Sequence, residues 1–168
     1  MKPLRLGVDT NVLLDLADGE ERVADAFSVL AHRLASSDIC VLPSVLDELA
    51  FLHESGETAH IRQLARRALH LIREHKHGFR PLLELACPPT SIEEVAGEIR
   101  SQDLLPPQEV NDSLILAEAA LAGCALLLSS DEHLRGVDHE RLTLLLNRFD
   151  LVAPVTATPR EIVHKFFH

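Results

Sequence analysis

Residues 4–16, LRLGVDTNVLLDL, join an apolar run, an acidic residue and a helical pattern. The run from Leu4 to Val8 is short and apolar, so it predicts a first buried strand that ends at Asp9. A helix is predicted immediately afterwards, from Asn11 to Leu16. An ionised carboxylate at the end of a buried strand costs free energy unless something compensates it. Asp9 is therefore either a simple helix cap, a position that Asp suits well, or a functional carboxylate.

Short apolar runs alternate with helical patterns along the rest of the chain. Further strands are predicted at 39–42, 125–128 and 151–155. Helices are predicted at 20–34, 44–52, 61–72, 91–100, 109–122 and 159–167, with Gly123 as a helix stop. This alternation predicts an α/β fold with a mostly parallel central sheet, formed by one domain over residues 1–168. In such sheets, sites form beyond the carboxyl ends of the strands, and Asp9 and Asp131 both follow predicted strands.

The composition favours a folded protein outside the membrane. Hydrophobic residues make up 46% of the 168 residues, and no apolar run approaches the eighteen or so residues that cross a bilayer. The N-terminus does not resemble a signal peptide, which predicts a cytoplasmic protein. The three cysteines are widely spaced and predict reduced thiols: Cys40, Cys87 and Cys124. The net charge of −10 opposes long-range attraction to nucleic acid.

Glu48 lies in a predicted helix with the sequence PSVLDELAFL (43–52). Ser44 and Asp47 fit a capping box, which gives Asp47 a structural role and leaves Glu48 without one. The same-face neighbours of Glu48 include Val45 and Phe51, so its carboxylate is predicted to point toward the apolar side of the helix. The alternative is an ordinary solvated carboxylate.

Two further carboxylates occupy similar places. Asp112 lies in the first turns of its helix, on the face of Ile115 and Leu116, although the helix dipole alone also favours an acid there. Asp131 follows ALLLSS and could cap a short helix at 132–134. If Asp9, Glu48, Asp112 and Asp131 converged, they would repel one another without a cation. Hard divalent cations such as Mg²⁺ or Mn²⁺ take oxygen ligands and would allow hydrolysis of a phosphodiester.

In order, these residues resemble the PIN-domain ribonuclease family. The opening strand followed by DTN (9–11) looks like the first motif of the family, and Glu48 is similar to its second acidic position. LPPQEVNDSLILAEA (105–119) matches the region in which Asp112 starts a helix. LLLSSDEHL (126–134) resembles the final strand and turn, with the fourth acidic position.

The resemblance implies a Rossmann-like sandwich, a Mg²⁺ or Mn²⁺ site and RNA as the substrate. It also implies that the metal ligands are Asp9, Asp112 and Asp131, while Glu48 binds the metal through water or orients the attacking water. The supporting polar residues it implies are Thr10, Asn11 and Ser129, with Ser129 forming hydrogen bonds within the last turn.

The chain most resembles the toxin branch of the family, because it is compact. Many bacterial and archaeal members are toxins of toxin–antitoxin pairs, often homodimers neutralised by a small partner. This chain departs from the pattern at His133, where many relatives carry a further Asp, and this departure bears on whether a second metal binds. It is also longer than a minimal toxin, with the surplus between Glu57 and Arg100.

A basic stretch, HIRQLARRALHLIREHKHGFR (60–80), runs against the overall acidity. Arg62, Arg66 and Arg73 fall roughly opposite its apolar stripe and are predicted to contact RNA phosphates. The alternative is a solvated helix face. His75 and His77 are predicted to be surface residues.

Two rival functions follow from the same residues. The first is a PIN-like binding or regulatory module without catalysis, which the net charge and His133 favour. The second is a structure-specific DNA nuclease with the same metal chemistry.

Overall fold

The computed structural model describes residues 3–33 and 38–166. Within them the elements are β1 (Arg5–Val8), α1 (Thr10–Ala17), α2 (Glu21–Arg33), β2 (Asp38–Val41), α3 (Pro43–Ser55), α4 (Ala59–Arg73), a 3₁₀ turn η1 (Lys76–Gly78), β3 (Phe79–Pro81), α5 (Pro89–Ser101), α6 (Val110–Leu121), β4 (Leu126–Leu128), α7 (Glu132–Arg135), α8 (His139–Asn147), β5 (Val155–Ala157) and α9 (Pro159–Phe166). The ends of two predicted helices, Leu34 and Phe167, lie outside the described residues.

The five strands form one parallel sheet in the order β3-β2-β1-β4-β5. β1 is central, and Gly7 in it pairs with Cys40 on one side and Leu127 on the other. The chain moves outward from β1 to β3 and then returns to the other side of β1 for β4. The carboxyl ends of β1 and β4 therefore lie at the switch point of the sheet, where parallel α/β folds place their sites.

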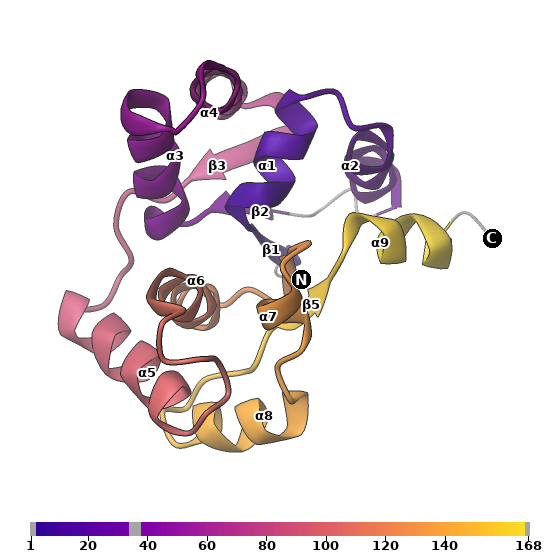
Figure 1. Ribbon diagram of the computed structural model, residues 1–168. Helices are drawn as coiled ribbons and strands as arrows, with labels where there is room; N and C mark the ends of the chain where they lie inside the picture. Colours follow the sequence, from indigo (N-terminus) through magenta and orange to yellow (C-terminus); the bar gives the residue numbers. More distant parts are fainter. Residues whose placement is uncertain (1–2, 34–37, 167–168) are drawn as a thin grey trace.

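Helices pack around this sheet, some beside sequence neighbours and some beside distant segments (Figure 1). α3 packs on α4 and α1, α5 on α6 and α8, and α2 on α9. α3 also contacts α6, so the two halves of the chain meet between these helices. The core is built mainly from Leu, Ile, Val and Ala, and its largest fully buried side chains include Phe27 and Phe79. No helix in the described ranges is both long and apolar enough to span a bilayer.

The predicted α/β class is confirmed, with local differences. The strand predicted at 151–155 begins instead at Val155 and ends at Ala157, because Pro154 cannot donate to a ladder. β3 was not predicted, because it is only three residues long and ends in Pro81. α8 was not predicted either, although Asp138 caps it by accepting a hydrogen bond from the Arg141 amide. The thiols of Cys40 and Cys124 are buried and free, and Cys87 is half-buried and free.

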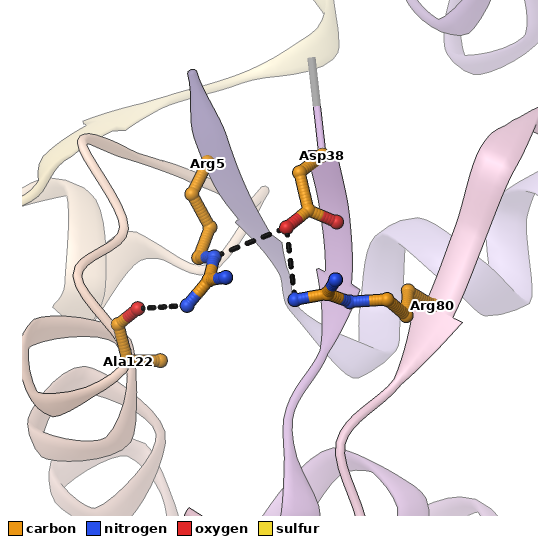
Figure 2. Close-up of polar contacts among 4 residues, drawn as sticks. All are labelled: Arg5, Asp38, Arg80 and Ala122. Carbon is orange, nitrogen blue, oxygen red and sulfur yellow. Dashed lines mark hydrogen bonds and ion pairs between the residues drawn. The ribbon is translucent and has the colours of Figure 1, made fainter. Parts of the chain in front are cut away.

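Three charged side chains tie the amino-terminal ends of β1, β2 and β3 (Figure 2). One carboxylate oxygen of Asp38 lies 3.1 Å from Nε of Arg5 and 3.0 Å from Nη2 of Arg80. Arg5 also donates to the carbonyl of Ala122, 2.7 Å away, at the end of α6. Arg80 therefore lies on the sheet edge and does not belong to a helical basic strip.

We expect Asp38→Ala to lower the free energy of unfolding by about 1–2 kcal/mol, measured by urea denaturation. The loss follows from removing the one acceptor shared by two guanidinium groups, moderated because both arginines are partly exposed. The control is Asp25→Ala at an exposed position of α2, where the change should stay within about 0.5 kcal/mol. Equal losses in the two variants would contradict the role of the Arg5–Asp38–Arg80 cluster.

Candidate active site

The carboxylate of Asp9 is buried at the end of β1 and is held by two donors. Its residue is only 3% exposed. The Thr10 amide donates to Oδ1 over 2.8 Å, which is the helix-cap role predicted for Asp9, and the Ser129 hydroxyl donates to Oδ2 over 2.7 Å. Burial raises the pKa of Asp9 to about 6, these two hydrogen bonds lower it, and the charges of Glu48 and Asp131 raise it. Asp9 is thus more than a cap.

Ser129 joins the ends of β1 and β4. It is fully buried, and its hydroxyl oxygen also accepts a hydrogen bond of 3.0 Å from the Asp131 amide. Asp131 in turn caps α7 through Oδ1, which accepts from the amides of His133 and Leu134. Its Oδ2 accepts no hydrogen bond from the described residues. The predicted cap is present, and it leaves one oxygen of Asp131 available.

Glu48 is brought to the same place by two side chains from other helices. Its Oε2 accepts a hydrogen bond of 2.6 Å from the buried Thr10 hydroxyl and one of 2.8 Å from the Asn111 amide. The prediction that Glu48 points toward the apolar side of its helix is only partly right, because Val45 is buried but Phe51 is 64% exposed. The direction of Glu48 is therefore set by polar partners on α1 and α6.

Asp112 faces the same cluster from the first turn of α6. Its pKa is raised to about 7, first by burial and then by the charges of Asp131, Asp9 and Glu109 and a hydrogen bond with Glu109. Glu109 also lies 3.5 Å from Nε2 of His133. Asp9, Glu48, Asp112 and Asp131 therefore converge on the switch point of the sheet from four different elements.

The supporting residues differ from those predicted. Thr10 and Ser129 lie inside the cluster, whereas Asn11 is exposed and its side chain forms no hydrogen bond among the described residues. The amide group beside Glu48 comes from Asn111 instead. Its position directly before Asp112, in the same helical turn, was the only signal available in the sequence.

The predicted capping box of α3 is wrong. The N-cap residue is Leu42, which has no side-chain cap, and Asp47 is exposed. Instead, the buried carboxylate of Glu118 on α6 accepts hydrogen bonds from the amide and the hydroxyl of Ser44, at 2.8 and 2.6 Å. Sequence reasoning missed Glu118, although a carboxylate among the apolar residues of LILAEAAL (114–121) was a usable signal.

The predicted RNA-contacting arginines are not equivalent. Arg62 is half-buried and donates to the carbonyl of Gly56 over 2.6 Å, so it closes the end of α3. Arg66 and Arg73 are exposed. With Arg67 and His70 they form the basic surface of α4, which borders a hollow of about 520 Å³ next to Leu16 and Ala17.

The two histidines beyond α4 are exposed, as predicted, but neither lies on an α-helix, because His77 belongs to the 3₁₀ turn η1 and His75 precedes it. Both adopt positive φ, and Nδ1 of His75 lies 3.0 Å from the carbonyl oxygen of Phe79. The ring of His77 packs on Phe27 and Phe79, and burial lowers its pKa.

The carboxylates fit a hydrated divalent cation better than a closed metal cage. Among the described residues, no group of three or more His, Cys, Asp or Glu side chains is arranged to hold a metal ion directly. Mg²⁺, however, usually keeps several waters and is bound through only one or two carboxylates. A cation would relieve the repulsion that raises the pKa values of Asp9 and Asp112. The donor set, which consists of oxygens only, suits a hard cation.

The fold and cluster define an α/β protein with an acidic site at the switch point of a parallel sheet. The family model of the PIN domain matches residues 7–140. The chain is also similar to a chain of the crystal structure of VapBC2 from Rickettsia felis bound to a DNA fragment from their promoter, with a TM-score of 0.60, 14% identity, and coverage of 92% of this chain and 98% of that chain. No significant match is found among curated proteins.

The chain therefore belongs to the PIN-domain family, a family of nucleases. This confirms the family expected from the ordered acidic motifs. The similar solved structure agrees with the fold.

We expect Asp112→Asn to stabilise the metal-free protein at pH 8, raising its melting temperature by roughly 2–8 °C, or about 1–2 kcal/mol. The pKa of Asp112 is raised from 3.8 to about 7 on folding, so its ionised form opposes folding at pH 8. The gain should shrink as the pH falls from about 7 toward 3.8, and it should vanish below that value, where the carboxyl is neutral in both states. Thermal melts in chelator across this range measure it.

Glu140→Gln is the matched control, because Glu140 is an exposed acid in the first turn of α8. Loss of its favourable helix-dipole interaction should lower stability slightly. A lower melting temperature for Asp112→Asn at pH 8 would show that the carboxylates do not repel as argued.

Proposed function

We propose that the protein is a metal-dependent endoribonuclease that hydrolyses RNA phosphodiester bonds. Its acidic centre comprises Asp9, Glu48, Asp112 and Asp131. The observation that carries this proposal is the buried Asp9 carboxylate, held by Ser129 and Thr10 and raised in pKa partly by its acidic neighbours. Such an arrangement is unfavourable for folding alone, and it suits a cation and the chemistry of phosphoryl transfer.

Asp9, Asp112 and Asp131 are the proposed ligands of Mg²⁺ or Mn²⁺. PIN-domain nucleases generally use divalent metal ions. When bound, the cation lowers the pKa of a water and stabilises charge that develops on the phosphoryl group. Asp131 fits this role because one of its oxygens remains available beyond the α7 cap.

Glu48 is the proposed residue for orienting the attacking water. Thr10 and Asn111 both donate to Oε2 of Glu48. Its other oxygen, Oε1, accepts no hydrogen bond from the described residues. That oxygen is free to accept a hydrogen bond from water. Ser129 keeps Asp9 and the turn before Asp131 in register through its two hydrogen bonds.

RNA is the proposed substrate, and the basic surface of α4 is its proposed contact outside the acidic centre. α4 packs on α1, the helix that begins at Thr10 beside the site. Arg66 and Arg73 are exposed there, so they provide local positive charge despite the net charge of −10.

A toxin of a toxin–antitoxin pair is the proposed biological role, in the cytoplasm and as a homodimer with a small antitoxin protein as partner. The similar solved structure is of VapBC2, bound to a DNA fragment from their promoter. Its likeness to 92% of this chain is one of fold, and the match of family and fold together supports this role. Co-purification with the product of an adjacent short gene tests the partner directly.

Asp9→Asn is expected to lower Mg²⁺- or Mn²⁺-dependent cleavage of single-stranded RNA by roughly a hundredfold or more, the scale for losing one electrostatic group of an active site. The fold should persist, because an Asn amide can still accept from the Thr10 amide and can donate to Ser129. Asp15→Asn, a half-buried acid in the second half of α1 that neighbours Asp18 and Glu20 rather than the site, is the control and should remain active. Full activity of Asp9→Asn would overturn the site.

A binding module without catalysis is the second candidate, favoured by the net charge and by the lack of a closed metal cage among the described residues. Mn²⁺ titration separates the two. For a nuclease, a hundredfold excess over Kd adds about 2.7 kcal/mol, or roughly 5–10 °C in melting temperature. A module without a metal site shows no metal-linked rise. Parallel assays on single-stranded RNA, DNA and flapped DNA test the DNA nuclease alternative.

The double variant Arg66→Gln/Arg73→Gln is expected to weaken RNA binding and to reduce the slope of log affinity against log salt by about 1.4, since each single-strand phosphate contact contributes about 0.7. The turnover rate at saturating RNA should change little. The double variant Arg22→Gln/Arg33→Gln, at exposed positions near the two ends of α2, controls for the loss of two positive charges. An unchanged salt slope would exclude the basic surface of α4 from the RNA interface.

A further inference from the structure

Two polar contacts join α3 to α6. Glu48 and Ser44 lie one turn apart on the same face of α3. Asn111 and Glu118 lie seven residues, or two turns, apart on one face of α6. Asn111 binds Glu48 and Glu118 binds Ser44. Because the start of α6 meets the later residue on α3, the two helices lie antiparallel along this seam.

The two contacts differ in where they lie. The Asn111–Glu48 contact is part of the acidic site itself. The Glu118–Ser44 contact lies about 6 Å from it toward the start of α3 and about 10 Å from it toward the end of α6. It touches none of the proposed metal ligands, and Glu118 is only 2% exposed.

We propose that Glu118 is a positioning residue, which sets α3 against α6 through Ser44 so that Glu48 reaches the acidic site. This inference rests on the proposed nuclease function. Glu118 binds two atoms of one residue, because Oε1 accepts from the Ser44 amide and Oε2 from the Ser44 hydroxyl. Two hydrogen bonds to one residue fix both the rotation of α3 about its own axis and the position of α3 along that axis relative to α6.

The rotation of α3 about its axis determines whether the Glu48 side chain reaches the acidic site. That side chain must point at both Thr10 on α1 and Asn111 on α6, and a turn of α3 would move it away from both. The neighbours of Glu48 constrain rotation only in part, since Val45 and Leu49 are buried while Phe51 is exposed. A carboxylate beside the first amides of a helix is also favoured by the helix dipole.

A purely structural role would predict a different result. The anchoring of any helix end by a buried carboxylate should affect stability, and removal of Glu118 would leave the Ser44 amide and hydroxyl without their partner. Lower stability alone therefore does not test the proposal. The discriminating quantity is the turnover rate of the folded variant at a temperature well below its melting transition.

The experiment measures kcat, KM for single-stranded RNA and the Mn²⁺ concentration for half-maximal activity in full-length variants. Glu118→Ala is expected to lower kcat roughly 10- to 100-fold, the scale for a small misplacement of a catalytic group. KM for RNA should change by less than about twofold, because the basic surface of α4 is untouched. Ser44→Ala should lower kcat less, since the backbone amide of Ser44 remains.

Glu118→Gln is the conservative variant, and it should retain most of kcat. Its amide oxygen can accept from the Ser44 amide, and its NH₂ group can donate to the Ser44 hydroxyl. In the double variant Ser44→Ala/Glu118→Ala, the two losses should not add, because each removes the same contact. Asp138→Ala, which removes the cap of α8, is the control for lost stability with unchanged kcat.

The outcomes separate this inference from the proposed function. If the unsubstituted protein shows no Mn²⁺-dependent RNA cleavage, the nuclease proposal itself fails. If it cleaves RNA and folded Glu118→Ala has the same kcat, Glu118 is structural only and the positioning role is overturned. If Glu118→Gln is as impaired as Glu118→Ala, the charge and not the geometry matters, which also overturns it. If Glu118→Ala does not fold, the kcat of folded Ser44→Ala decides: a lowered value supports the positioning role, and an unchanged value overturns it.

Discussion

The hydrogen bond from Ser129 to Asp9 is the contact on which the rest of the site depends. It joins the ends of β1 and β4 and places a carboxylate where water is excluded. The same hydroxyl accepts from the Asp131 amide, so one buried side chain fixes two acidic residues at once. Sheet order makes this possible, because β4 returns to pair with β1 after β2 and β3 have been placed on its other side.

Glu48 and Asp112, the other two acidic residues, lie on helices, and backbone hydrogen bonds do not fix the position of a helix relative to its neighbours as they fix that of a strand. A ladder of backbone hydrogen bonds fixes the register of β1 and β4, whereas packed apolar faces allow α3 and α6 to slide and rotate. Polar contacts between helices remove that freedom. Asn111 binds Glu48 within the site, and Glu118 binds Ser44 behind it. The acidic centre therefore combines a rigid strand edge with two helices held by specific side chains.

The sequence reveals the strand half of the site better than the helical half. Asp9 and Asp131 directly follow apolar runs, and parallel strands bring such ends together, so their placement could be predicted. Asn111 and Glu118 could not, because their partners lie 63 and 74 residues away and no local pattern indicates them. The capping box predicted for Ser44 and Asp47 failed for the same reason. The Ser44 amide, which the capping box would have paired with Asp47, donates instead to the distant carboxylate of Glu118. The short strands β3 and β5 fall near Pro81 and Pro154, where pairing patterns are weakest.

The acidic cluster opposes the folding stability of this molecule. Burial and, after it, the charges of neighbouring carboxylates raise the pKa values of Asp9 to about 6 and Asp112 to about 7, so near neutral pH the cluster destabilises the folded state on its own. Two features offset that cost: a core of Leu, Ile, Val and Ala, and the Arg5–Asp38–Arg80 cluster at the amino-terminal ends of the strands. Carboxylates that served only as helix caps would not need to face one another, since Asp138 caps α8 from an exposed position. The convergence of Asp9, Glu48, Asp112 and Asp131 at the switch point of the sheet is therefore the feature that the proposed cation would explain.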